Sequence, residues 1–107
     1  MKIYYAIRHK TNKSLYYDDR SIYGEADKDT ILRGSERSVT SKLNDINRKL
    51  RLSIQGYEKE KSNGTMKISD ASLDELKSVL NTGEVVPVTL SLKELVITVQ
   101  LLEDDAE

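Results

Sequence analysis

The 107-residue sequence lacks cysteine, tryptophan and phenylalanine, and it contains a single proline. Without cysteine, a disulfide framework, a cysteine-ligated zinc site and a cysteine nucleophile are all excluded. No apolar run approaches the roughly 18 residues of a membrane span, and the N-terminus has no signal-peptide core. We therefore expect a soluble, intracellular protein that forms one small domain over residues 1–102, followed by an acidic tail at 103–107.

Residues that usually carry enzyme or metal chemistry are also scarce. His9 is the only histidine, and at the end of a predicted strand it is typical of a hydrogen-bonded surface residue. The segment 27–29 opens like a calcium-binding loop, but Leu32 stands where glycine is needed and Ser38 where glutamate is needed. The glycines are isolated, so no phosphate-binding loop is present. We expect no enzyme activity, no catalytic residue, no cofactor and no metal site.

Charge is present in quantity, and it is divided unevenly along the chain. Residues 1–55 carry 12 basic and 7 acidic side chains, a net charge of +5, whereas residues 56–107 carry 5 and 11, a net charge of −6. The six tyrosines lie in or beside the basic half. Tyrosine and arginine together are typical of interface hot spots. Alternatively, a one-domain fold interleaves the two halves and cancels the field.

The hydrophobic pattern predicts an α+β fold, with two helices packed on one face of a mainly antiparallel sheet. Residues 2–9 alternate as a strand, and residues 15–17 return as the second strand of an N-terminal hairpin. Residues 18–30 are polar and predict a loop, with a short strand at 30–32. The most apolar part of the chain predicts a C-terminal strand pair at 86–92 and 95–101, with Lys93-Glu94 as either a tight turn or a bulge.

The spacing of Val39, Leu43, Ile46 and Leu50 predicts a first helix, capped by Ser35 or Ser38. Residues 52–69 are harder to assign. Asn63-Gly64 is a strong turn signal, Thr65–Ile68 has the alternation of a strand, and Tyr57–Lys61 could pair with it or form a charged loop. A second, short helix follows, capped by Asp70 or Ser72 and ended by Gly83.

Two surfaces are candidates for binding. The first helix presents a polar, cationic face, and the predicted partner-binding residues combine this face with tyrosines: Arg37, Arg48, Arg51, Tyr16, Tyr17 and Tyr23. The same face could instead meet nucleic-acid phosphates, the alternative function. The last strand, with Leu95, Ile97, Val99 and Leu101, would favour self-association or partner pairing if it lies at a sheet edge. In the other interpretation, both C-terminal strands lie inside the sheet.

Three stretches together resemble a group of small accessory proteins of tailed bacteriophages. Tyr4–Lys10 is similar to their opening strand, which reads Ala-Ile-Arg-His-Lys. Ile31–Arg37 resembles their next element, and Val85–Leu90 their C-terminal strand. This sequence departs from them at 11–13, where Thr-Asn-Lys replaces Pro-Thr-Gly, and in having a further strand at its end. The resemblance carries no residue roles. It implies a phage accessory protein in the cytoplasm of a bacterial host.

Within that context, the lack of catalytic chemistry favours a protein that works by occupying another protein. We therefore expect a non-enzymatic phage protein that binds and inhibits a host or antiphage-defence protein, with a homodimer as one form it could take.

Overall fold

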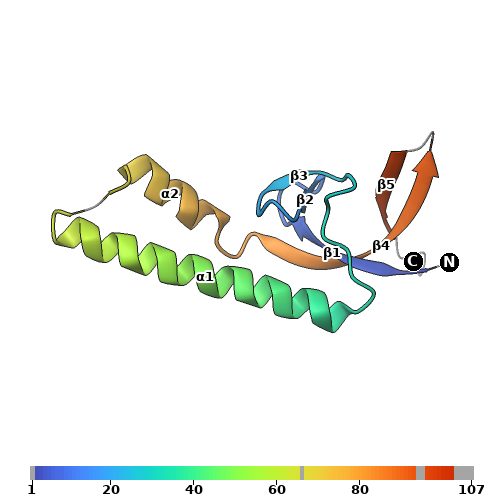
Figure 1. Ribbon diagram of the computed structural model, residues 1–107, viewed down its shortest axis with the longest axis horizontal. Coiled ribbons are helices and arrows are strands. Elements are labelled where there is room, and N and C mark those ends of the chain that lie inside the picture. Colours follow the sequence, from blue (N-terminus) through green and yellow to red (C-terminus); the bar gives the residue numbers. More distant parts are fainter. Residues whose placement is uncertain (1, 66, 94–95, 103–107) are drawn as a thin grey trace. The chain divides into compact units, whose positions relative to one another are not determined.

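The computed structural model describes residues 2–65, 67–93 and 96–102, and it confirms the predicted α+β class. Within these residues, five strands form one antiparallel sheet, and two helices separate the third strand from the fourth along the chain (Figure 1). The strands are β1 (Tyr4–His9), β2 (Leu15–Tyr17), β3 (Tyr23–Glu25), β4 (Gly83–Lys93) and β5 (Val96–Leu101), and the helices are α1 (Glu36–Ser62) and α2 (Asp70–Val79). No helix in this described part of the chain is both long and apolar enough to cross a membrane.

The chain folds into two compact units. The first contains residues 1–43 and 83–107 and includes the whole sheet, and the second contains residues 44–82. Helix α1 has 27 residues and extends for about 40 Å. The boundary between the units falls within it, between Leu43 and Asn44, so α1 belongs to both. The predicted acidic tail at 103–107 lies outside the described residues.

The sheet of the first unit has the strand order β3-β2-β1-β4-β5. Both the predicted N-terminal hairpin, β1 with β2, and the predicted C-terminal strand pair, β4 with β5, are confirmed. β1 also pairs with β4, from Tyr4↔Val88 to His9↔Gly83, which joins the two ends of the chain. β4 and β5 run antiparallel from Val88↔Leu101 to Lys93↔Val96, so they are two strands and not one bulged strand. The connecting residues 94–95 lie outside the described residues.

Strand β3 corrects the sequence prediction, which placed residues 18–30 in a loop and a strand at 30–32. Tyr23–Glu25 pairs with β2 instead, and the later segment makes only the isolated bridges Asp18↔Thr30 and Tyr5↔Arg33. Gly24 lies in the middle of β3 and Glu25 ends it, and neither residue type favours a strand, so β3 left no strand signal in the sequence.

Both faces of the sheet contribute buried residues to the first unit. On one face, Ala6, Tyr16, Val86 and Val88 form a buried cluster, and residues of the loop that follows β3 pack against it. Ile7 points to the opposite face and is also buried, and Leu43 of α1 lies close to it near Gly83. Helix α2 belongs to the other unit, so the packing of both helices on one face stays a prediction.

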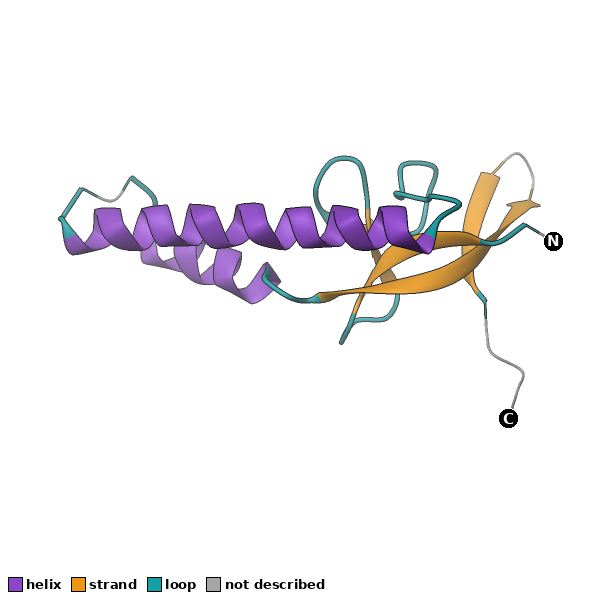
Figure 2. Ribbon diagram, turned by 90° about the horizontal axis from the view of Figure 1, so that it is seen from below, coloured by secondary structure: helices purple, strands orange, loops and turns teal. Residues whose placement is uncertain are grey.

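In the second unit, α1 continues well beyond the predicted segment and runs unbroken to Ser62 (Figure 2). Ile54 extends the apolar spacing and is buried, as is Leu73 of α2. Ion pairs connect the two helices: Lys61 Nζ lies 2.9 Å from Asp70 Oδ1, and Lys77 Nζ lies 3.0 Å from Glu58 Oε1. The prediction of a paired strand or loop at residues 57–61 is therefore wrong. Helix propensity and packing against α2 prevail over the local turn signal.

The Asn63-Gly64 turn ends a helix and does not form a hairpin. Gly64 has φ of 72°, its N–H donates to Lys61 O at 3.1 Å, and the N–H of Thr65 donates to Glu60 O at 2.8 Å. This is the Schellman pattern of a helix C-terminus. The predicted strand at 65–68 is absent at its described positions, residues 65, 67 and 68; position 66 lies outside the described residues.

The boundaries of α2 also differ from the predicted ones. Ser69, not Asp70 or Ser72, is the N-cap, and its Oγ accepts the N–H of Ser72 at 3.1 Å. Leu80 is the C-cap, and Asn81, with φ of 60°, takes the left-handed position assigned to Gly83 in the sequence prediction. Gly83 instead begins β4.

Candidate protein-binding surfaces

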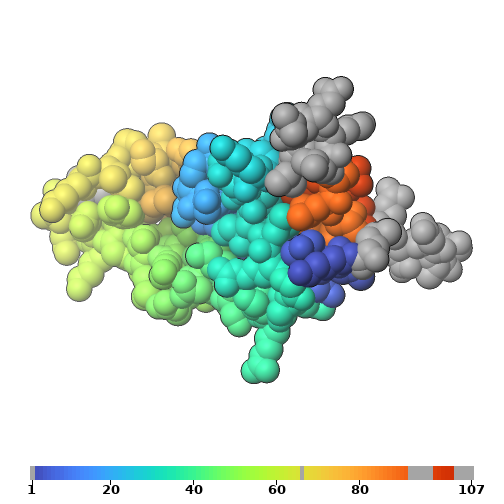
Figure 3. Space-filling model, turned by 45° about the vertical axis from the view of Figure 1, so that its right-hand side comes forward, coloured from blue at the N-terminus to red at the C-terminus, as the bar shows by residue number. Residues whose placement is uncertain are grey.

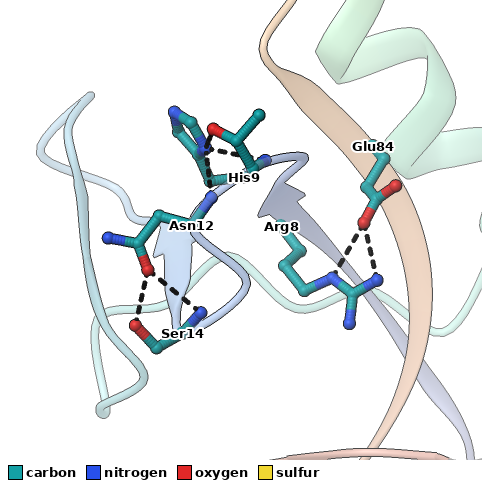
Figure 4. Close-up of polar contacts among 6 residues, drawn as sticks. Arg8, His9, Asn12, Ser14 and Glu84 are labelled. Atoms are coloured by element: carbon teal, nitrogen blue, oxygen red, sulfur yellow. Dashed lines mark hydrogen bonds and ion pairs between the residues drawn. The ribbon is translucent and has the colours of Figure 1, made fainter.

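His9 ends β1 and shapes the turn that follows it (Figure 4). Its Nδ1 atom accepts hydrogen bonds from the N–H groups of Thr11 at 3.2 Å and Asn12 at 3.0 Å. The imidazole ring also packs edge-on against Tyr23, with 5.1 Å between ring centroids. An imidazole nitrogen that accepts backbone bonds in this way stabilises a turn. The interpretation of His9 as a hydrogen-bonded residue is confirmed.

Arg8 acts within the sheet. Its Nε and Nη2 donate to Glu84 Oε2 at 2.9 and 2.6 Å, and the two residues stand opposite each other on β1 and β4 (Figure 4). The side chain of Arg8 is largely buried, so this charge-assisted bond is partly shielded from water. Arg8 and His9, both part of the stretch at 4–10 that resembles phage proteins, thus both stabilise the fold.

The connection between β2 and β3 is a tight turn, Asp18–Ile22, organised by a buried carboxylate. Asp18 is 2% exposed. Its Oδ1 accepts the N–H of Arg20 at 2.8 Å, and its Oδ2 accepts Nε and Nη2 of Arg20 at 3.1 and 2.7 Å. The N–H of Asp18 donates to Ile22 O at 3.0 Å, and the N–H of Ser21 donates to Asp18 O at 3.1 Å. These bonds fix the turn in one conformation.

The pKa of the Asp18 carboxyl is lowered from its usual value by these contacts. Burial alone would raise the pKa, but bonds from the Arg20 side chain and from the backbone of Arg20 and Ile22 favour the anion more strongly. Because the folded-state pKa is depressed, the stabilisation is present above the ordinary aspartate pKa and is lost as the pH falls through the folded value. The turn is therefore intact at neutral pH.

The turn presents a cationic side chain at its tip, Arg20, and an apolar side chain at its base, Ile22, whose C=O accepts the N–H of Asp18. Ile22 is 53% exposed and is the only apolar residue among residues 18–22. The Arg20 side chain is 56% exposed, although two of its nitrogens bind Asp18. Between them, Ser21 has φ of 65°, in the left-handed region that non-glycine residues rarely adopt. The sequence prediction missed Arg20 and Ile22 as candidate binding residues. The one available signal was a single isoleucine in the polar run between β2 and β3, two strands that contain tyrosine.

The three tyrosines predicted to bind a partner lie within or beside the core. Tyr16 and Tyr17 are each 7% exposed, and Tyr16 belongs to the buried cluster on one face of the sheet. Tyr17 and Tyr23 pair across β2 and β3, with ring centroids 5.3 Å apart in an edge-to-face arrangement. They flank the Asp18–Ile22 turn and support it. At this end of the sheet, Arg20 and Ile22 therefore offer more surface to a partner than the tyrosines do.

The three predicted arginines are all exposed on α1, with Arg37 in the first unit and Arg48 and Arg51 in the second. Arg48 Nη2 lies 2.6 Å from Asp45 Oδ1, and Lys49 Nζ lies 3.0 Å from Asp45 Oδ2. Asp45 therefore offsets part of the positive charge on which the nucleic-acid alternative depends. Exposed pairs of this kind contribute little to stability.

Strand β5 lies at an edge of the sheet. In the strand order, β4 is its single neighbour among the described strands. The interpretation that both C-terminal strands lie inside the sheet is therefore wrong for β5. Of the predicted self-association residues, Ile97, Val99 and Leu101 belong to β5, and Leu95 lies outside the described residues. In the space-filling view, residues of β4 (orange) form part of the surface next to the N-terminal residues in dark blue (Figure 3).

No group of three or more histidine, aspartate or glutamate side chains in the described residues is arranged to hold a metal ion. The chain matches no protein-family model, and comparison with curated proteins and with solved structures finds no match either. The resemblance to phage proteins therefore rests on the motifs at 4–10, 31–37 and 85–90 alone.

Proposed function

We propose that the protein is a non-enzymatic accessory protein of a tailed bacteriophage, which binds and inhibits a host or antiphage-defence protein in the bacterial cytoplasm. The phage context comes from the resemblance in the three sequence motifs. The observation that most supports binding is Ile22, an apolar side chain that is 53% exposed in the turn organised by buried Asp18. We assign the Asp18–Ile22 turn as the contact with the target.

A turn that is already ordered favours tight binding, because association then loses little conformational entropy in ordering the contact. Burying a whole isoleucine side chain is worth about 1.5–3 kcal/mol, so the exposed half of Ile22 contributes about 0.8–1.5 kcal/mol, which is about a 4- to 13-fold change in Kd. Arg20 Nε and Nη2 bind Asp18, and Nη2 also lies 3.7 Å from Asp27 Oδ2, so the charge of Arg20 is offset within the chain. The target surface that fits is an apolar pocket.

The experiment compares two matched variants, Ile22→Ser and Ile3→Ser. Ile3 is also an exposed apolar residue of the first unit, 42% exposed, but it precedes β1 and lies outside the turn. Proteins captured from a host lysate on the immobilised chain are identified by mass spectrometry, purified, and titrated calorimetrically with each variant. We expect Ile22→Ser to weaken binding about 4- to 13-fold and Ile3→Ser to leave it nearly unchanged.

Two results would contradict the proposal. Equal binding by the two variants would show that the turn is not the contact. Capture of no specific protein, with nucleic acid co-purifying in a salt-sensitive way, would replace protein binding by the alternative function, in which the α1 face from Arg37 to Arg51 contacts phosphates.

A further inference from the structure

The two edges of the sheet differ in how well they are protected from pairing. At one edge, β3 has three residues and ends in Glu25, and short edge strands with charged side chains resist further pairing. At the other edge, β5 pairs with β4 without interruption over Val96–Leu101. This segment has no charged residue and no proline. Among the described residues, the first unit therefore has one protected edge and one open edge.

The hydrogen bonds of β4 show which backbone groups of β5 face the open edge. The N–H of Leu102 donates to Pro87 O at 3.0 Å, directly after the Val88↔Leu101 pair. In an antiparallel ladder, hydrogen-bonded pairs alternate with pairs whose N–H and C=O groups face away from each other. The backbone groups of Thr98 and Gln100 therefore face β4. Those of Ile97, Val99 and Leu101 face the open edge.

The pairing of β1 supports the same assignment independently. Tyr5 exchanges backbone bonds of 2.7 and 3.1 Å with Arg33, on the side of β1 away from β4. The backbone of its neighbour Tyr4 must then face β4, where its partner is Val88. Since the backbone groups of Val88 face β1, those of Leu101 on the far side of Val88 are left facing outward.

We propose that a second copy of this chain pairs with the open edge, with the two β5 strands antiparallel about a two-fold axis at Val99. Val99 then stands opposite Val99 of the second copy, and Ile97 stands opposite Leu101. Each of the three pairs that result exchanges two N–H···O bonds. An interface of this kind is the same on both copies, so it closes as a dimer and does not propagate into a fibre.

From Ile97 to Leu101, the sequence of β5 alternates between apolar and polar residues symmetrically about Val99, so each residue meets one of the same kind in an antiparallel second copy. Val99 pairs with Leu90 on β4, which is 40% exposed, and the dimer places the two Val99 side chains together on that apolar face. On the opposite face, Thr98 meets Gln100 of the second copy, so polar groups face polar groups. No charged side chain opposes another within residues 97–101. This symmetry favours a second copy over an unrelated strand.

The mass of the full-length protein in solution tests the pairing directly. Light scattering after gel filtration should give twice the 12.2 kDa of the chain. Val99→Pro removes one outward N–H from each copy and leaves the bonds to β4 in place, whereas the control Val99→Ala shortens the same side chain but keeps the N–H. We expect Val99→Pro to weaken the dimer about 100-fold or more and Val99→Ala only a few-fold.

Hydrogen exchange on the unmodified chain tests the same edge without a substitution. The amides of Ile97, Val99 and Leu101 should become protected as the concentration rises, while those of Thr98 and Gln100 are protected at every concentration. A chain that stays monomeric up to about 1 mM, or a folded Val99→Pro variant that remains a dimer, would overturn the proposal. Concentration-independent exchange at the three outward amides would overturn it too.

The dimer goes beyond the proposed function and can fail separately from it. The Asp18–Ile22 turn joins β2 to β3, at the opposite end of the strand order from β5. Ile22→Ser should therefore leave the mass in solution unchanged, and Val99→Pro should still bind the target through its turn.

Discussion

Gly83 opens β4 at a point where the first unit leaves no space for a side chain. A Cβ atom at this position would lie 2.7 Å from Tyr23 Oη, 2.8 Å from Ile7 Cγ2 and 2.9 Å from Leu43 Cδ1. All three distances are shorter than the contacts that Cβ atoms make in folded proteins. Ile7 is fully buried, so it cannot move aside into solvent. Gly83→Ala must therefore displace packed side chains.

Overpacking of this kind destabilises proteins by about 1–3 kcal/mol. For a chain of this size, each kcal/mol lowers Tm by about 4–8 °C, so the variant should melt roughly 5–20 °C below the wild type. Urea unfolding followed by circular dichroism provides the free energy, and a thermal scan provides the Tm. Gly34→Ala is the control, because a Cβ there meets nothing within 4 Å. We expect this control to leave both quantities nearly unchanged.

A second substitution separates this explanation from the one that the sequence suggested. If Gly83 were a left-handed helix terminator, asparagine would be tolerated there, since asparagine adopts that conformation readily. Under the packing explanation, Gly83→Asn is worse than Gly83→Ala because its side chain is larger. An unchanged Tm for Gly83→Ala, or a Gly83→Asn variant more stable than Gly83→Ala, would refute the packing argument.

Three further predictions concern other parts of the chain. Gly56 lies inside α1, where an added Cβ atom would meet nothing within 4 Å, so Gly56→Ala should raise the free energy of unfolding by about 0.5–1 kcal/mol in urea titrations. Asp18→Asn removes the charge from the bonds of the turn and should lower that free energy by about 1.5–3 kcal/mol. The wild type should lose the same contribution in acid, as the pH falls below about 4, and an equally steep acid loss in Asp18→Asn would contradict the assignment. In gel-shift assays at about 50 mM salt we expect no binding of DNA or RNA; a shift that the double variant Arg37→Glu/Arg48→Glu abolishes would favour the nucleic-acid alternative.

The sequence predicted elements that carry a repeated pattern. Alternation over several residues located β1 and the C-terminal strand pair, and the spacing from Val39 to Leu50 located α1. Local signals were less reliable. Asn63-Gly64 is compatible with a hairpin turn and with a helix C-terminus, and only the bond from the N–H of Thr65 to Glu60 O identifies the second. Which one forms depends on whether the preceding helix finds a packing partner, here α2.

The candidate site was harder to predict because burial is a property of the folded chain. Tyrosine is a residue type that is common at protein interfaces, but the pairing of β2 with β1 and β3 places Tyr16 and Tyr17 in the core. Ile22 looks unremarkable in sequence and becomes a candidate only because its side chain is 53% exposed in the turn that Asp18 organises. The position of β5 at an edge likewise follows from strand order, which the sequence pattern does not specify.

The charge division along the sequence shows how folding changes a surface argument. The two halves of the sequence carry net charges of +5 and −6. In the fold, β1 from the basic half pairs with β4 from the acidic half, and Arg8 binds Glu84 across that pair. Counted by folded unit, residues 1–43 with 83–107 hold 10 basic and 12 acidic side chains, a net charge of −2, and residues 44–82 hold 7 and 6, a net charge of +1. Neither unit has the strong field that attracts a polyanion from a distance. The proposed binding of a target and of a second copy would therefore depend on short-range contacts, and the exposed Ile22 and the uncharged edge of β5 are features of that kind.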